Sequence, residues 1–167
     1  MGASMAAIVS LHAKAFGVSA KISGLYLGAG AFIADRLPVG NVDQYRSRKD
    51  ERCLRSPILD DKTSKLFAGC YAADTLSPYY RVCNEPSDDA HASQPRVYFQ
   101  ACGMDIFRDD SLIYEDILRS KAVDKRLDIY PGTPDLFWNV FQPGSIPQPT
   151  KWEKDTEAGC AWLLKRN

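Results

Sequence analysis

Three short segments, two of them largely apolar and the third with alternating apolar residues, predict the strands of a single sheet. The segments lie at 22–28, 97–102 and 126–130, and each ends in a stretch of small or turn-forming residues. The second segment is almost continuously apolar, which is typical of a parallel strand covered on both faces. We therefore expect a parallel sheet whose central strand is buried.

Other segments carry apolar residues at helical spacing. They lie near 4–16, 60–73, 109–118 and 152–164. Gly17 is well placed to end the first helix, and Asp109 and Asp110 place negative charge at the positive start of the third. The pattern predicts an α/β fold of about three parallel strands with four or five flanking helices.

Two regions do not follow either periodicity. Residues 35–94 are irregular apart from the helix near 60–73, and an insertion of this length between core strands is usually functional, although a plain surface excursion fits the residues as well. Residues 142–149 contain three prolines, so we expect a turn-rich loop that cannot continue a helix.

An acidic residue follows the central predicted strand. Gly103 allows the chain to turn sharply, and Asp105 then lies at the carboxyl end of the strand, where open α/β sheets place their chemistry. An aspartate at this point can instead pair with Arg108 or cap the next helix. The residues alone leave both interpretations open.

Two motifs carry a family resemblance. Residues 105–109, Asp-Ile-Phe-Arg-Asp, resemble the Asp-Pro-Leu-Arg-Asp element of the α/β-hydrolase fold-3 family, which includes the hormone-sensitive-lipase-like and arylacetamide-deacetylase-like carboxylesterases. Residues 130–138, Tyr-Pro-Gly-Thr-Pro-Asp-Leu-Phe-Trp, are similar to the family's Tyr-Pro-Gly-x-Pro-His-x-Phe-Trp. The resemblance implies serine-type hydrolysis of carboxylic esters with Asp105 as the triad acid. It also implies a histidine at position 135, where this chain has Asp135.

The start of the chain is similar to the helix that follows the family's nucleophile elbow. In that register the nucleophilic serine would precede Met1, and no oxyanion loop of the His-Gly-Gly-Gly type occurs. We expect a partial α/β-hydrolase fold, the carboxyl-terminal half, forming one domain over 1–167 with a cap-like, pocket-lining insertion at 35–94. Met1 is then either the true start or an internal methionine of a longer product.

Aromatic residues are the candidates for ligand contact. The resemblance implies that Tyr79 lines the approach to an acyl pocket, and Phe137 and Trp138 follow the position of the family histidine. We expect any ligand to be a small apolar ester or another small hydrophobic molecule. A substitute triad of Ser4, His12 and Asp105 is disfavoured, because no strand precedes Ser4 to build the strained turn of an elbow.

Asp135 changes the expected chemistry. A carboxylate is a weak base at neutral pH, and two carboxylates brought close together raise the pKa of at least one of them. We therefore expect little or no esterase activity from the chain alone, as in a pseudoenzyme. The alternative is a non-catalytic ligand-binding or protein-interaction module, in which the strand near Ile22 offers an unpaired edge to a partner or to a second copy.

The amino-acid composition argues against several classes of function and of binding site. The 21 basic and 21 acidic residues give no net charge, so nothing in the charge favours binding to nucleic acid, and no apolar run is long enough to span a membrane. The five cysteines are an odd number without C-x-x-C spacing, which argues against a disulfide framework and a zinc site. We expect reduced thiols in a cytoplasmic protein that uses no metal and no cofactor.

Overall fold

The computed structural model describes residues 2–34, 45–142, 144 and 147–165. One three-stranded sheet lies at its centre, in the order β1 (Leu25–Gly28), β2 (Val97–Cys102) and β3 (Lys125–Tyr130). Both strand pairs are parallel, with Leu25 opposite Val97 and Val97 opposite Lys125. Every residue of β2 is buried. The predicted parallel sheet with a buried central strand is therefore confirmed.

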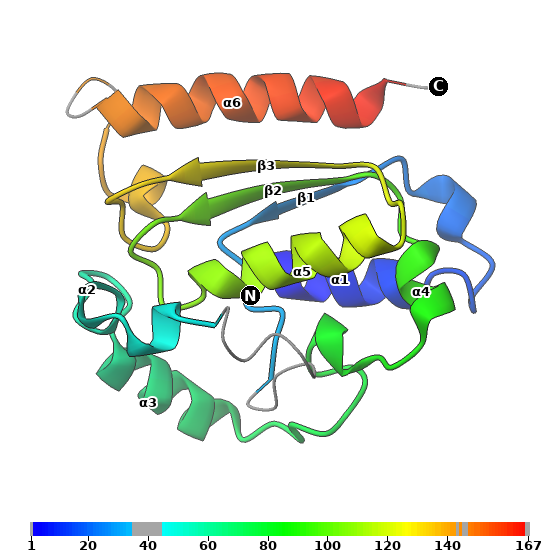
Figure 1. Ribbon diagram of the computed structural model, residues 1–167, viewed down its shortest axis with the longest axis horizontal. Coiled ribbons are helices and arrows are strands. Elements are labelled where there is room, and N and C mark those ends of the chain that lie inside the picture. Colours follow the sequence, from blue (N-terminus) through cyan, green and yellow to red (C-terminus); the bar gives the residue numbers. More distant parts are fainter. Residues whose placement is uncertain (1, 35–44, 143, 145–146, 166–167) are drawn as a thin grey trace.

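Helices cover both faces of this sheet. Those of the described residues are α1 (Gly2–His12), α2 (Glu51–Leu54), α3 (Asp61–Tyr71), α4 (Asp88–Ala92), α5 (Arg108–Ser120) and α6 (Pro147–Leu164), with short 3-10 turns η1 (Ser19–Lys21), η2 (Ser47–Lys49), η3 (Val82–Asn84) and η4 (Phe137–Asn139). Figure 1 shows α6 lying across one face and α1 and α5 under the other. Because each strand runs into a helix or loop at the same edge, that edge gathers the chain segments that follow the strands.

Three element boundaries differ from the prediction by more than two residues. Helix α1 ends at His12 and not near residue 16, because residues 13–17 continue as turns. Helix α6 begins at Pro147, because proline is tolerated in the first turn of a helix, where its missing N–H has no partner to lose. Strand β1 begins at Leu25 and not at Ile22, because the Ile22 N–H donates to Ser19 O and closes η1. The predicted insertion starts within residues 35–44, which lie outside the described residues; its described part contains α2, α3 and α4.

An apolar core joins the sheet to α1 and α5. Its centre is aromatic: the ring of Phe32 lies 6.0 Å from Phe99 and 5.4 Å from Tyr114, and Phe99 and Tyr114 meet edge to face at 5.8 Å. Ala7 and Leu11 of α1 pack into the same cluster. Edge-to-face aromatic pairs add to the free energy of apolar burial, so this cluster holds both helices on the sheet.

A polar network joins the opposite face to α6. Gln100 is fully buried in β2; its Oε1 accepts the Tyr26 hydroxyl at 2.5 Å, and its Nε2 donates to Tyr130 at 2.8 Å and lies 3.0 Å from the Thr156 hydroxyl of α6. Burial raises the pKa of Tyr26 and Tyr130, so both remain protonated donors. A buried network rigidifies a structure only when its members are bonded, which is the case for Gln100.

Helix α6 approaches the sheet most closely at Gly159. A Cβ atom at this position would lie 2.0 Å from Cε1 of Tyr98, far inside van der Waals contact. Only glycine allows the helix backbone to reach the tyrosine ring, so the depth of α6 on the sheet depends on this residue.

Two carboxylates at the start of α5 bind the segments on either side of residues 35–44. Asp110 Oδ2 accepts the backbone N–H groups of Phe32 and Ile33 at 2.8 and 2.9 Å. Asp109 Oδ2 accepts those of Arg46 and Ser47, both at 2.6 Å. From the sequence, Asp109 and Asp110 were expected only to place negative charge at the positive start of a helix. In the structure they also bind two segments that are more than 60 residues away in the sequence.

Substitution of Gly159 by alanine tests the close approach of α6. Gly159→Ala should lower the free energy of unfolding by about 1–3 kcal/mol, because the added methyl group displaces the helix or the Tyr98 ring. Gly69→Ala is the matched control: it lies in α3, where an added methyl group would have no atom within 4 Å, so it should be neutral or stabilising by up to about 1 kcal/mol. Urea unfolding followed by circular dichroism measures both, and equal effects would contradict the assignment.

Substitution of Asp110 by asparagine tests the anchor. Asp110→Asn should cost about 1–3 kcal/mol of unfolding free energy, because the amide keeps one acceptor oxygen but turns an NH2 donor toward the Tyr45 hydroxyl and Arg48, which both meet Oδ1 of the carboxylate. Asp116→Asn, on the exposed side of the same helix, should change it by less than about 0.5 kcal/mol. Thermal and urea unfolding provide the comparison; a cost for Asp110→Asn as small as that of its control would show that the anchor contributes little.

Candidate functional site

The loops that follow β2 and β3 are joined through their backbones. The N–H of Gly103 donates to Tyr130 O, and that of Met104 donates to Thr133 O, both at 2.8 Å. A Cβ atom at Gly103 would lie 2.8 Å from Tyr130 O and from Pro131 Cα, so only glycine lets the two loops meet. This contact brings Asp105 of the first loop close to Asp135 of the second.

Asp105 and Asp135 form a buried acidic pair. Their exposed fractions are 1% and 8%, and the Oδ1 atom of Asp105 accepts the Phe107 N–H at 2.8 Å. Burial, with a further contribution from the negative charge of Asp135, raises the pKa of Asp105 to about 7. Burial also raises the pKa of Asp135 to about 6. Near neutral pH the pair therefore retains a proton that ordinary aspartates would have lost.

Arg108 supports the loop that carries Asp105 without pairing with its carboxylate. Its Nη1 donates to Gly103 O at 3.1 Å and its Nε donates to Asp109 Oδ1 at 2.7 Å. The sequence left two structural roles open for Asp105: pairing with Arg108, or capping the next helix. In the structure Asp105 accepts the backbone N–H of Phe107, and Arg108 bonds to Gly103 and Asp109 instead. Arg108 is a positioning residue whose role was not foreseen, although its place within the 105–109 motif marks it.

The aromatic residues beside Asp135 pack against α6. Phe137 is fully buried, with its ring 5.3 Å from Tyr130 and 5.1 Å from Trp138. Trp138 is partly exposed and stacks on Trp152 at 5.1 Å with nearly parallel rings. These contacts hold the loop after β3 on the sheet. The predicted contact of Phe137 and Trp138 with a ligand stays a prediction.

Tyr79 lies apart from the acidic pair. Its ring is 4.7 Å from His12, the last residue of α1, and α1 runs away from the strand ends over about 16 Å. Ser4, near the start of the same helix, accepts the Ala31 N–H at 3.2 Å. Ser4 and His12 are thus two turns apart, and the substitute triad is not assembled. Tyr79 is likewise held at the His12 end of α1.

Neither histidine of the chain serves Asp105. His12 packs on Tyr79, and its buried Nε2 has no hydrogen-bond partner among the described residues. His91 is buried in α4, where its Nε2 lies 3.0 Å from Glu85 O and its ring faces Tyr114. Both rings are held by other elements, so neither histidine lies beside Asp105, whereas Asp135 does.

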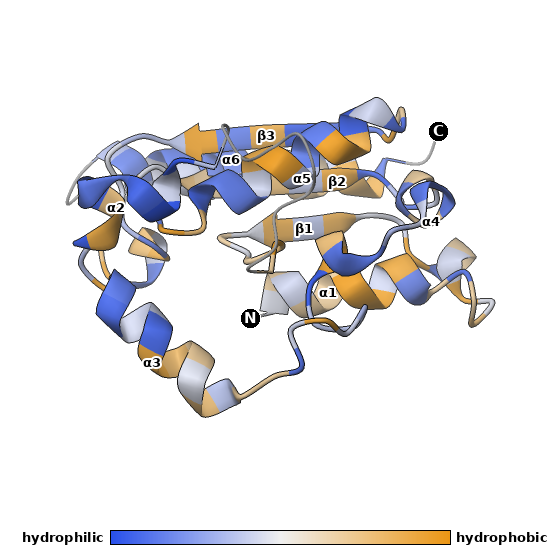
Figure 2. Ribbon diagram, turned by 60° about the horizontal axis from the view of Figure 1, so that its bottom comes forward, coloured by the Kyte–Doolittle hydropathy of each residue, from blue (hydrophilic) through white to orange (hydrophobic). Residues whose placement is uncertain are grey.

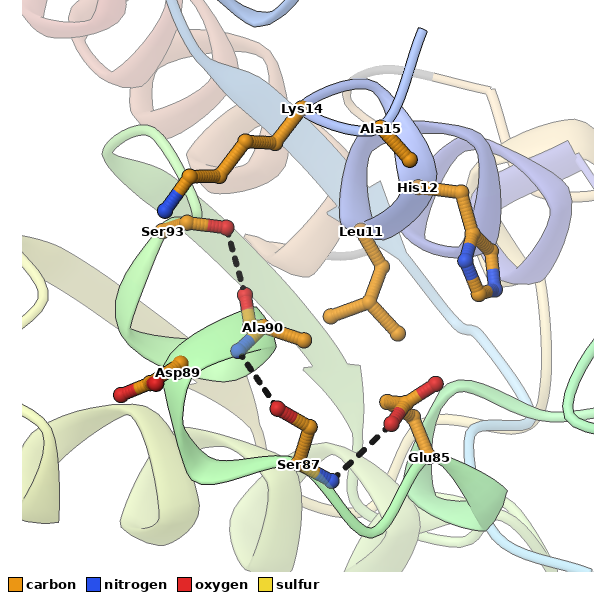
Figure 3. A pocket seen from close by; sticks show the side chains of 9 residues that line it. All are labelled: Leu11, His12, Lys14, Ala15, Glu85, Ser87, Asp89, Ala90 and Ser93. Carbon is orange, nitrogen blue, oxygen red and sulfur yellow. Dashed lines mark hydrogen bonds between the residues drawn. The ribbon is translucent and has the colours of Figure 1, made fainter.

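A surface hollow of about 350 Å³ lies between α1 and α4, at the His12 end of α1. Figure 3 shows that several polar groups around it already bond to one another: Ser87 accepts the Ala90 N–H, Ser93 donates to Ala90 O, and Glu85 accepts the Ser87 N–H. The hollow is therefore remote from the acidic pair and adds no chemistry to it.

Metal-ligating side chains and apolar helices were the remaining features to consider among the described residues. Within them, no three side chains of the His, Cys, Asp or Glu type gather as they would around a metal ion. Among the described residues, no helix is both long enough and apolar enough to cross a bilayer.

Comparison with known proteins identifies the fold. A family model described as the alpha/beta hydrolase fold matches residues 1–139. An AB hydrolase superfamily protein of Schizosaccharomyces pombe is 31% identical over 121 residues, which are 72% of this chain and 34% of that protein. The chain thus spans about a third of this curated relative.

Solved structures give the same result. Vibralactone cyclase is 25% identical with a TM-score of 0.86, over 97% of this chain and 46% of its own. A thermostable esterase from Pseudomonas putida, 18% identical with a TM-score of 0.78 over 99% of this chain and 50% of its own, supports the fold alone. Because the family model covers most of the chain and the yeast relative exceeds 30% identity, the chain belongs to the alpha/beta hydrolase fold family, in the fold-3 branch.

Proposed function

We propose that this chain carries the acid side of a serine-type carboxylesterase site, with Asp105 as the inherited triad acid, and that alone it hydrolyses esters weakly or not at all. One observation carries the proposal: Asp105 is buried against a second carboxylate, Asp135, while both histidines are held elsewhere. The acid of the motif is thus kept in its place, but the group that it would orient is missing.

The chemistry of the pair supports low activity. A serine nucleophile needs a base that accepts its proton near neutral pH, and a triad acid that fixes the tautomer of that base. When Asp135 is protonated it cannot act as a base, and when it is ionised it is a weak base that repels the charge of Asp105. Loss of a triad member lowers the rate by several orders of magnitude.

The family supports the substrate class. Several solved neighbours are described as esterases, and each is covered over only about half of its length, so their activities are carried to this chain as a proposal. A ligand at Asp135 would meet the partly exposed ring of Trp138, with Phe137 packed behind it. This setting favours a small apolar ester or a related hydrophobic molecule.

Ester hydrolysis tests the proposal directly. The unmodified chain should hydrolyse p-nitrophenyl butyrate at the same rate as buffer, and Asp105→Asn should leave that rate unchanged, because no base stands beside the acid. The assay follows release of p-nitrophenol at pH 7 to 8. Turnover that is clearly above buffer and is abolished by Asp105→Asn would overturn the proposed lack of activity.

The dependence of stability on pH tests the acidic pair. A pKa that is raised on folding means that the folded state binds its proton more tightly, so stability declines as pH rises from about 4 through about 6 and about 7. Asp135→Asn removes one ionisation and should be more stable than the unmodified chain by about 1–3 kcal/mol at pH 8. The difference should vanish near pH 4.

The matched control for this experiment is Asp89→Asn, an exposed aspartate of α4. Its unfolding free energy should follow that of the unmodified chain at pH 4.5, 6 and 8, as measured by urea unfolding. A gain from Asp135→Asn that is the same at all three pH values would mean that the pair does not hold a proton.

A further inference from the structure

The outer edge of β3 has no partner strand among the described residues. Strand β2 lies between β1 and β3, so the described sheet bonds β3 on one side and leaves its other side open. Every residue of β2 is buried, whereas Ile129 of β3 is 41% exposed. Helices α5 and α6 pack on the two faces of β3, which lies along the upper rim of the sheet in Figure 2. An open edge of this kind readily accepts a further strand.

The backbone groups that point out of the sheet belong to every second residue of β3. The carbonyl groups of Asp124 and Tyr130 both accept N–H groups from the β2 side, at 3.0 and 2.8 Å. Because the backbone N–H and C=O groups of successive residues alternate between the two sides of a strand, those of Lys125, Leu127 and Ile129 point away from β2. These residues can therefore bond to another strand while the ladder between β2 and β3 stays intact.

Two charged side chains flank Leu127 on the face of the sheet that carries α6. The Asp128 carboxylate accepts the Tyr98 hydroxyl at 2.7 Å, and the Arg126 guanidinium lies 5.1 Å from the centre of the same ring. Arg126 and Asp128 form an ion pair at 3.1 Å, and their side chains remain 33% and 21% exposed. The edge thus presents one positive and one negative group, placed symmetrically about Leu127.

A second copy of β3 fits this edge in an antiparallel register centred on Leu127. In a symmetric antiparallel pair the two-fold axis passes through one residue, and residues at equal distances on either side of it lie opposite each other. With the axis at Leu127, Arg126 of each copy lies opposite Asp128 of the other copy, and the two side chains are on the same face. Opposite charges placed across two strands in this way stabilise the pairing, whereas like charges destabilise it.

Other registers are less favourable. An axis at Lys125, Arg126 or Asp128 would place identical charges directly opposite each other. An axis at Ile129 would bring Pro131, which has no N–H to donate, into the ladder. Charge and backbone therefore select the same register, the one centred on Leu127.

We propose that the outer edge of β3 binds the same edge of a second copy of this chain, in an antiparallel pair centred on Leu127. Leu127 exchanges backbone hydrogen bonds with its own copy, and Lys125 of each chain bonds to Ile129 of the other. Arg126 and Asp128 of the two copies form a ring of four alternating charges, and such a network stabilises more than an isolated surface pair. The proposal is independent of the proposed catalytic role.

The size of the contact sets its strength. A short strand ladder belongs to the small interfaces, which are typical of weak association, and the flanking helices α5 and α6 add area on the two faces. We therefore expect a dimer that dissociates on dilution.

Sedimentation of the full chain tests the dimer. Between micromolar and millimolar concentrations the mass should rise from 18.6 kDa toward twice that value. In hydrogen exchange followed by NMR, the amides of Leu127 and Ile129 should slow by about tenfold or more over the same range, because they gain partners. The amide of Arg126 faces β2 and should not change. A chain that stays monomeric, or protection at Tyr26 and Gly28 of the β1 edge instead, would overturn the proposal.

A proline in β3 tests the backbone ladder. Ile129→Pro removes an N–H that points out of the sheet and leaves the bonds to β2 in place, so it should weaken dimerisation by about tenfold or more. Ile129→Ala is the matched control, because it shortens the same side chain but keeps the N–H, and its dimer should form nearly as well as that of the unmodified chain. Equal losses in the two variants would show that no strand ladder forms at this edge.

A charge exchange tests the register and does not depend on the proline variant. Arg126→Asp places like charges opposite each other and should weaken dimerisation by about tenfold or more. Arg126→Asp combined with Asp128→Arg exchanges the two signs, restores the opposite charges and should recover most of the lost affinity. Circular dichroism checks that both variants fold. A folded double variant that associates as weakly as Arg126→Asp alone would refute the register centred on Leu127.

Discussion

The backbone contact at Gly103 is the constraint on which the site depends. Gly103 and Met104 donate to Tyr130 and Thr133, and a side chain at position 103 would force the two loops apart. Because β2 and β3 are parallel and in register, their loops leave the sheet at one edge, and this contact joins them there. The acidic pair is a consequence: two carboxylates share a buried space because their backbones are tied together.

The two faces of the sheet are held by different forces. Below it, aromatic and aliphatic packing around Phe99 anchors α1 and α5. Above it, hydrogen bonds around Gln100 and the close approach at Gly159 anchor α6. Apolar packing tolerates small shifts, whereas a buried network loses free energy when one bond is broken. Helix α6, and through Trp152 the loop that carries Asp135, is therefore held in one position.

Several contacts support the loop that carries Asp105 and the segments around it. The loop contact, the Arg108 brace and the Asp109–Asp110 anchors all serve to position Asp105 and the segments around it. The neighbouring position holds a carboxylate, which binds a proton tightly in this environment and cannot replace an imidazole.

The sequence by itself determined the three strands, the helices α1, α3, α5 and α6 and the position of Asp105 at the end of β2, because apolar periodicity and turn residues act locally. It did not predict α2 and α4, which lie in the region expected to be irregular. It also indicated that Asp135 would stand close to Asp105, through the resemblance at 130–138. Only the tertiary structure decided that Gln100 sits bonded in an otherwise apolar strand, that Asp109 and Asp110 hold distant loops, and that Tyr79 joins His12 and not Asp105. Those outcomes depend on which side chains meet across the fold, and a pattern read along one chain does not contain that information.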